Sequence, residues 1–266
     1  MLCVACVRGR TDEPLLAAVY CGMGRSAVRD KRRPHVARAP TNQILADLPS
    51  AVSRGFIARC EPIELQLGDL ICDPGDRIQH VYFPIGGFIS LISSLDARPR
   101  LEVGLIGAEG MLGAALVLGV DVAQLRAIVQ GRGSALRMSA AQFSRELSHS
   151  RALDDTLKRY VYVLMSQLAQ MAACTHFHVL EARLARWLLM TRDRAHSVKF
   201  YITQEFLAYM LGVRRVSVTN AASELQERRL IRYTRGNMTI LNERGLEAIS
   251  CECHKVAKGI YNQVMH

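Results

Sequence analysis

The chain has 266 residues, half of them hydrophobic and 22% charged, which is the balance of an ordinary globular protein. No apolar run approaches the roughly 20 residues that cross a bilayer as a helix. The sequence has no G-x-S-x-G, Walker or H-E-x-x-H motif, so we expect neither a membrane protein nor an enzyme. The formal net charge of +10 comes mainly from residues 1–40 and 199–235. This placement suits contact with phosphates, although a solvated basic surface would carry the same charge.

The eight cysteines are scattered along the chain, which indicates a reducing compartment, and we expect a cytoplasmic protein. Residues 1–40 are rich in arginine, glycine and proline and show no hydrophobic period, so they predict a disordered basic tail. Residues 42–48 then form a short amphipathic pattern that Pro49 ends.

A period of two residues begins at Ile63, where Ile63, Leu65 and Leu67 alternate with polar neighbours. Turn signals such as Gly68-Asp69 separate several such segments. Short alternating segments with many glycine-containing corners predict an antiparallel β roll over residues 41–145.

The period then becomes helical, and residues 146–175 predict a long helix. Its apolar residues step by four and three positions in the manner of a coiled-coil seam: Leu157, Val161, Leu164, Leu168 and Met171. We expect this helix to contact both its own roll and a partner subunit as a dimerisation helix. The alternative is a helix that packs only on its own roll.

Residues 203–231 have the pattern of two short helices joined by a turn that contains Gly212, which is typical of a helix-turn-helix. Two alternating segments around Arg235-Gly236-Asn237 follow and predict a β-hairpin wing. A last helix is expected from about Glu243, with Asn242 as its N-cap. Residues 176–266 thus predict a winged helix domain, and the whole chain an α+β fold.

This order of roll, long helix and winged helix resembles the Crp/Fnr family of bacterial transcription regulators. Residues 203–231 follow the family pattern T-x-E-x-L-A-x-x-L-G-x-x-R-x-[ST]-V, and residues 65–91 resemble the first hairpins of its cyclic-nucleotide-binding-like roll. The resemblance implies a homodimer that binds near-palindromic double-stranded DNA, with RNA polymerase as a further partner and a small-molecule signal at the roll.

The same resemblance assigns roles within the second helix of the motif. Arg215 matches an arginine that reads guanine, and Ser217 matches a hydroxyl that contacts phosphate. Val216 and Asn220 depart from the family pattern, so we expect an operator different from the best-known consensus. The predicted DNA-binding residues are Thr203, Arg214, Arg215, Val216, Ser217, Thr219, Asn220 and Arg235.

Cyclic-nucleotide-binding relatives hold the ribose with a glutamate and the cyclic phosphate with an Arg-Ser pair. Gly107, Glu109 and Gly110 keep the glutamate among glycines, but the aligned strand offers Arg126 without the pair. These four residues are the candidate effector pocket, and a phosphate without its full partners would be poorly solvated there. We therefore expect no certain cofactor and consider a cyclic nucleotide disfavoured.

Cysteine and histidine residues raise two further hypotheses, an iron–sulfur cluster and a metal site. Cys3, Cys6 and Cys21 with one later cysteine would suit an iron–sulfur redox regulator, although their spacing is wider than in cluster-binding relatives. A second group lies at the end of the long helix and a third in the last helix: Cys174, His176 and His178; Cys251, Cys253 and His254. Because positions i and i+2 diverge on a helix, the group in the last helix is not expected to converge on one metal ion. At both groups we expect ordinary packing, with a zinc site as the weaker alternative, so no metal is assigned. A roll whose winged helix binds proteins instead of DNA is the remaining alternative.

Overall fold

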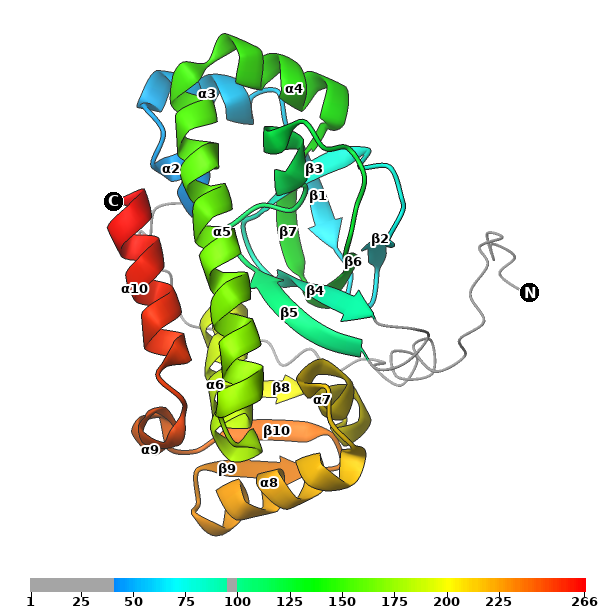
Figure 1. Cartoon of the computed structure of the whole chain (residues 1–266), viewed down its shortest axis with the longest axis vertical. Helices are drawn as coiled ribbons and strands as arrows, with labels where there is room; N and C mark the ends of the chain where they lie inside the picture. The colour runs from blue at the N-terminus through cyan, green and yellow to red at the C-terminus, as the bar shows by residue number, and fades with distance from the viewer. Residues whose placement is uncertain (1–40, 95–99) are drawn as a thin grey trace, which may run out of the picture.

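The computed structural model describes residues 41–94 and 100–266, so the tail expected over residues 1–40 lies outside the described residues. Figure 1 shows a β-rich N-terminal half, a long helix along one side and a smaller helical half at the opposite end. The expected α+β architecture is confirmed. Within the described residues no helix is both long enough and apolar enough to cross a membrane.

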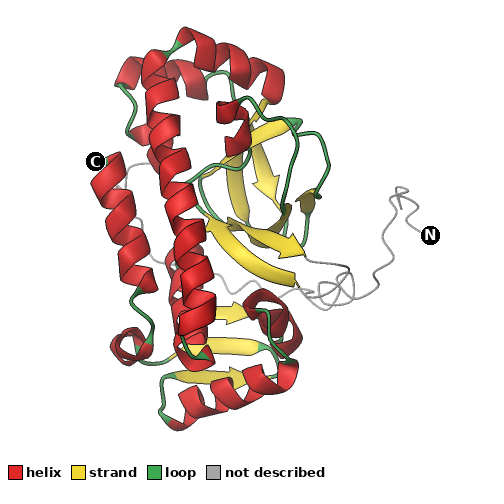
Figure 2. Ribbon diagram, in the orientation of Figure 1, coloured by secondary structure: helices red, strands yellow, loops and turns green. Residues whose placement is uncertain are grey.

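The N-terminal half is a roll built from two antiparallel sheets, which appear as the upper yellow arrows in Figure 2. One sheet has the order β1-β7-β3 and the other the order β2-β6-β4-β5. The strands are β1 Glu61–Leu65, β2 Leu70–Cys72, β3 His80–Pro84, β4 Phe88–Ser94, β5 Arg100–Ile106, β6 Arg126–Gly131 and β7 Gly133–Ser139.

Glycines allow two corners of the roll to cross at close range. Gly87 has a φ of 73°, and a Cβ built on it would lie 2.2 Å from the carbonyl oxygen of Gly131. A Cβ on Gly133 would lie 2.2 Å from the carbonyl oxygen of Gly86. No side chain fits between these backbones, so the turn from β3 to β4 and the turn from β6 to β7 require glycine.

Short helices close the roll at the end far from the helix-turn-helix. Asn42 caps the first of them and is only 1% exposed, because its amide donates to the carbonyl oxygens of Pro84 (3.0 Å) and Gly110 (2.7 Å). These contacts fix the start of the described chain on the roll. The helices are α2 Gln43–Ala46, α3 Ser50–Ile57, the 3₁₀ helix η1 Ala114–Leu118 and α4 Ala140–His149.

The long helix α5 (Arg151–Phe177) packs on the roll with the first half of the expected seam. Leu157 and Val161 are buried in the same core cluster as Phe56, Phe83 and Phe143. The face that α5 leaves exposed runs instead through Tyr162, Met165, Ala169, Ala172 and His176. The first half of the expected seam thus packs on the roll, and the exposed residues form a second stripe with the same three- and four-residue steps.

The C-terminal half is built around a three-stranded sheet of order β8-β10-β9, in which the hairpin β9–β10 is the expected wing. Its elements are α6 Leu180–Ala195, β8 Lys199–Tyr201, α7 Gln204–Leu211, α8 Arg215–Glu227, β9 Ile231–Thr234, β10 Asn237–Ile240 and α9 Glu243–Ile249. Its core continues into the roll, because Trp187 of α6 shares a cluster with Ile92 and Ile128.

The expectation of one last helix is wrong. The chain leaves α9 at Ser250, whose ψ of 150° is extended, and a new helix, α10 (Cys253–Met265), begins after Cys251 and Glu252. Figure 1 shows α10 returning along α5 toward the N-terminal half. Tyr261 and Met265 are buried in the core of the roll, so the end of the chain packs on the N-terminal half and not on the winged helix.

Candidate nucleic-acid interface

The helix-turn-helix begins with a cap and turns at a glycine. The Thr203 hydroxyl accepts a hydrogen bond from the backbone N–H of Phe206 (3.1 Å) and so starts α7. Gly212 has a φ of 64°, which ends α7 in the left-handed conformation that glycine adopts without strain. Val218 and Leu225 are buried on the inner face of α8 and fix that helix against α7.

The opposite face of α8 is exposed at its start, where the sequence placed the recognition residues. Arg214, Arg215 and Asn220 are exposed, Val216 is 67% exposed, and Ser217 is half-buried. Neither arginine forms an ion pair with any described residue. A helix N-terminus that carries two unpaired guanidinium groups attracts anions, because the helix dipole and both charges act in the same direction.

Two predicted residues support the geometry of the motif through bonds of their own. The Thr219 hydroxyl lies within hydrogen-bond distance of two acceptors, the Gln204 side-chain oxygen (3.0 Å) and the Arg215 carbonyl oxygen (3.1 Å). The contact with Gln204 ties α8 to the start of α7. Thr203 acts as the cap of α7. No sequence signal marks Gln204, because its role depends on how the two helices cross.

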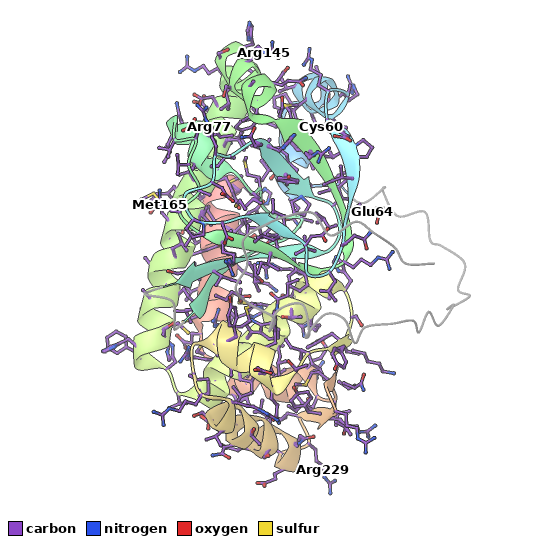
Figure 3. All side chains as sticks on the ribbon, turned by 90° about the vertical axis from the view of Figure 1, so that its right-hand side faces the viewer. Cys60, Glu64, Arg77, Arg145, Met165 and Arg229 are labelled. Atoms are coloured by element: carbon purple, nitrogen blue, oxygen red, sulfur yellow. The ribbon has the colours of Figure 1, made fainter. Side chains whose placement is uncertain are left out.

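The wing extends the basic surface. Arg235 has a φ of 48° and Gly236 a φ of 84°, so both residues turn the hairpin in the left-handed region. Arg229 and Arg232 are exposed near the same end of the molecule, and Figure 3 labels Arg229 at its lower tip. Arg228 is paired with Glu224 (2.7 Å), which leaves it less available than its neighbours.

The two charged residues among the four predicted effector residues have different partners. Glu109 pairs with Arg194 of α6 (2.5 Å), whereas Arg126 pairs with Asp73 in the loop after β2. The two glycines provide room for neighbours: a Cβ on Gly107 would lie 2.6 Å from the Glu109 carboxylate, and one on Gly110 would lie 2.4 Å from the Tyr160 hydroxyl. Glu109 thus joins the roll to the C-terminal half. The guanidinium group of Arg126 is already paired with the carboxylate of Asp73, which a bound phosphate would have to displace.

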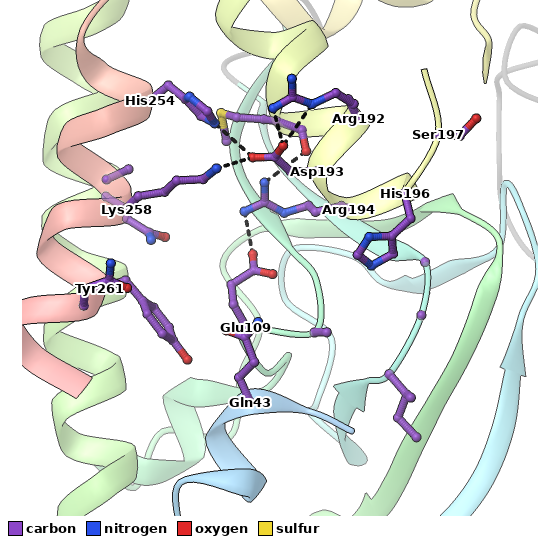
Figure 4. A pocket seen from close by; sticks show the side chains of 18 of the residues that line it. Gln43, Glu109, Arg192, Asp193, Arg194, His196, Ser197, His254, Lys258 and Tyr261 are labelled. Carbon is purple, nitrogen blue, oxygen red and sulfur yellow. Dashed lines mark hydrogen bonds and ion pairs between the residues drawn. The ribbon is translucent and has the colours of Figure 1, made fainter. Parts of the chain in front are cut away.

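The Glu109–Arg194 pair lines an open cleft of about 720 Å³ between the two halves. Figure 4 shows a second charged group in this cleft, where His254 and Lys258 of α10 point toward Asp193. Burial alone would raise the pKa of Asp193, but hydrogen bonds from His254, Lys258 and Arg192 outweigh it and hold that pKa below its usual value. The bonds from His254 and Lys258 attach α10 to α6, so the imidazole of His254 contributes to the contact between these two helices.

A buried carboxylate makes a second contact between the halves. Glu102 of β5 is 3% exposed and accepts hydrogen bonds from the Ser90 hydroxyl (2.8 Å) and from the indole N–H of Trp187 (2.9 Å). Burial raises the pKa of Glu102 to about 7, although these hydrogen bonds and the charges of Arg186 and Arg194 act in the opposite direction. This contact was not expected from the sequence.

Cysteine and histidine side chains from the two groups noted in the sequence come together in the structure, which was not expected. Cys251 lies in the break between α9 and α10, so the argument from divergence on one helix does not apply to it. The Sγ atoms of Cys174 and Cys251 are 3.5 Å apart, as are the Cys253 Sγ and the His178 Nδ1. We call these four side chains the thiol–imidazole cluster: Cys174, His178, Cys251 and Cys253.

The remaining cysteines and histidines of the expected groups lie apart from this cluster. His176 is exposed and packs against Phe177, at 4.6 Å between ring centroids. Burial raises the pKa of Cys60 to about 12 and also raises that of Cys72, so both thiols stay protonated. Residues 3, 6 and 21, on which the iron–sulfur alternative depends, lie outside the described residues.

Comparison with known proteins agrees with this architecture. Residues 182–249 match the Crp-like helix-turn-helix domain. A protein from Eubacterium rectale described as a Crp/Fnr-family regulator shares the fold with a TM-score of 0.63 and 16% identity, over 77% of this chain and 96% of that one. FixK2 from Bradyrhizobium japonicum gives 0.61 and 13%, over 72% and 98%.

A third similar structure is the c-di-GMP responsive global regulator CLP from Xanthomonas campestris, with a TM-score of 0.56 and 16% identity over 72% of this chain and 99% of that one. No curated protein sequence matches the chain significantly. At these low identities the structural likeness shows a shared fold, and the sequence match shows a Crp-like helix-turn-helix domain over residues 182–249.

Proposed function

We propose that this chain, which has the Crp/Fnr fold and carries a Crp-like helix-turn-helix domain, is a homodimeric transcription regulator that binds a specific DNA site. The observation that carries the proposal is the exposed, unpaired arginine pair at the start of α8. Arg214 and Arg215 stand on a helix whose other face is buried, so α8 can enter a major groove without unfolding.

Base reading follows from the side chains on the exposed face of α8. The guanidinium group of Arg215 can bond the O6 and N7 atoms of guanine together, which is worth about 1–3 kcal/mol of discrimination. Val216 suits the methyl group of thymine, and the amide of Asn220 suits the N6 and N7 atoms of adenine. Arg229, Arg232 and the wing would add phosphate contacts that carry no sequence information.

Dimerisation is assigned to the exposed face of α5. Tyr162 is 59% exposed and Met165 61% exposed, and Ala169 and Ala172 continue their stripe with the spacing of a helical seam. Figure 3 shows Met165 projecting from α5 away from the roll. A second copy of the chain is the occupant that matches this stripe, since two parallel copies of α5 would place two α8 helices for half-sites about one helical turn apart.

Control by a small molecule at the roll is also part of the proposal. A cavity of about 690 Å³ is lined by roll residues such as Leu91, Leu112 and Leu125 and by Leu164 of α5, so an occupant would touch the dimerisation helix. Its lining is largely apolar, and Arg126 is engaged with Asp73. We therefore expect cyclic AMP and cyclic di-GMP to leave the melting temperature of the purified protein unchanged.

The central experiment selects bound sequences from a randomised duplex library and then measures affinity by fluorescence anisotropy across a salt series. Wild type should select a near-palindromic sequence. Arg215→Ala should lose about 5- to 150-fold in affinity for that sequence, the equivalent of about 1–3 kcal/mol, with a smaller effect on random DNA. Arg145→Ala is the matched control, because it removes the same charge from an exposed residue at the opposite end of the molecule (Figure 3).

Equal losses for Arg215→Ala and Arg145→Ala, on all DNA sequences alike, would show that only charge is being read. A protein-interaction role for the winged helix would then replace the proposal. Dimerisation is tested separately by light scattering: Met165→Asp should convert a dimer into a monomer, whereas Cys60→Ser should not. A monomeric wild type at micromolar concentration would refute the dimer.

A further inference from the structure

The thiol–imidazole cluster unites two segments that are far apart in the sequence. Cys174 and His178 are one helical turn apart at the end of α5, so both face the same side. Cys251 approaches them from the break between α9 and α10, and Cys253 from the first position of α10. The four donor atoms all lie within 4.8 Å of one another.

This spacing matches a single tetrahedral ion. Zinc bonds of about 2.3 Å to sulfur and about 2.0–2.1 Å to nitrogen place neighbouring ligand atoms roughly 3.5–3.8 Å apart. The Cys174–Cys251 and Cys253–His178 separations are both 3.5 Å. Three thiols with one imidazole are a ligand set that structural zinc sites use.

The surroundings of the cluster also fit a metal centre. The three cysteines are buried, with Cys174 at 0% exposure, and they form a separate small core cluster. The side-chain amide of Gln170 donates to the Sγ of Cys253 (3.1 Å), and the backbone N–H of His178 donates to the carbonyl oxygen of Cys174 (3.2 Å). Such outer contacts orient the ligands before an ion binds.

Charge balance gives an independent observation. Arg186 is 5% exposed and forms no ion pair with any described carboxylate; its guanidinium group instead contacts the sulfur atoms of Met171 and Met190, and its Nε has no partner. Arg183, also buried, donates to the carbonyl oxygen of Leu211. A zinc ion with three thiolates and a neutral imidazole carries one net negative charge, which would compensate a buried guanidinium group beside it.

Two other uses of the same side chains fit less well. A disulfide between Cys174 and Cys251 would not explain why the side chains of His178 and Cys253 also point to the same place. An iron–sulfur cluster spreads its ligands over two or more iron atoms, so it needs more space than four donor atoms within 4.8 Å provide. We propose that the thiol–imidazole cluster binds one zinc ion, which fixes the end of α5 to the junction of α9 and α10.

The position of this site indicates a structural role. α5 ends at Phe177 and α6 begins at Leu180, so the cluster lies at the connection between the roll and the C-terminal half. Cys251 and Cys253 lie just beyond residues 182–249, the segment that matches the helix-turn-helix domain. An ion here would hold that domain from both of its ends.

The test measures metal in the full-length chain, purified without a metal-affinity column and reconstituted with zinc under reducing conditions. We expect about one zinc ion per chain by mass spectrometry of the elements, and replacement by cobalt should give the intense visible bands of tetrahedral cobalt with thiolate ligands. Cys251→Ser should lower the affinity for zinc at least roughly tenfold. Cys60→Ser and His176→Asn are matched controls, because they remove the same groups outside the cluster, and both should retain the ion.

Folding of each variant is checked by circular dichroism, and the wild type decides the question alone if Cys251→Ser does not fold. A folded wild type that holds less than about one tenth of an equivalent of zinc after reconstitution would overturn the proposal. So would an iron–sulfur spectrum, or a Cys174–Cys251 disulfide in the protein isolated under reducing conditions. Zinc retained by both Cys251→Ser and Cys253→Ser would place the ion elsewhere and would equally refute it.

Discussion

The contact between Glu102 and Trp187 makes the stability of the protein depend on pH near neutrality. The carboxyl group of Glu102 is buried, and its pKa is raised from 4.5 to about 7. The folded state therefore binds a proton that the unfolded state has already released between these two pH values. The contribution of Glu102 to stability is complete below pH 4.5 and is lost as the pH rises toward 7.

The size of this loss follows from the shift in pKa. Each pKa unit corresponds to about 1.4 kcal/mol, so the full difference is about 3 kcal/mol, and about 2–3 kcal/mol of it is lost between pH 5 and pH 8. Glu102→Gln keeps a side-chain oxygen that can accept the hydrogen bond from Trp187 but removes the ionisable group. We expect this variant to be more stable than wild type by about 2–3 kcal/mol at pH 8 and by less than about 1 kcal/mol at pH 5.

The assay is urea unfolding of both proteins at pH 5, 6, 7 and 8, followed by circular dichroism and by tryptophan fluorescence. Trp187 is the single tryptophan of the chain, so its emission reports on this contact alone. The stability difference between variant and wild type should grow with pH and level off above about pH 7. A difference that stays constant from pH 5 to pH 8 would refute the reasoning, because it would mean that Glu102 does not change its charge in the folded protein.

Two further substitutions test the local geometry by urea unfolding. Gly87→Ala should destabilise the protein by more than about 1 kcal/mol, because it combines a positive φ with a Cβ 2.2 Å from a carbonyl oxygen, and stability equal to wild type would contradict the crossing of the two turns. Thr203→Ala should cost about 1 kcal/mol by removing the cap of α7, whereas Thr203→Ser should retain most of the stability. Equal losses in both Thr203 variants would mean that the hydroxyl is not the stabilising group.

The winged helix could be predicted from sequence because its signals are local. A cap at Thr203, a glycine in the left-handed region and apolar residues in helical steps all lie within thirty residues or so of one another, and the match over residues 182–249 agrees with that prediction. The alternating strands of the roll were predictable for the same reason. Neither prediction required knowledge of which distant segments meet.

The features that could not be predicted from the sequence depend on packing between distant segments. The period of α5 fits two stripes equally well, and only the position of the roll shows that Leu157 and Val161 face inward while Tyr162 and Met165 face outward. The break before α10 carries neither proline nor glycine, so no local signal marks it. The cysteines therefore looked unable to converge, although the break at Cys251 is what brings them together.

The contacts between the two halves restrict how a signal could reach the proposed DNA-binding surface. Glu102 and Glu109 lie on and just after β5, and both bond α6, through Trp187 and Arg194. A rotation of the C-terminal half relative to the roll has to break or rearrange both bonds and expose Trp187, which is now 2% exposed. A ligand shifts such an equilibrium only by its difference in affinity for the two arrangements. Any effector that changes DNA affinity by this route must therefore change the emission of Trp187, and an effector that leaves it unchanged must act through the proposed dimer interface on α5 instead.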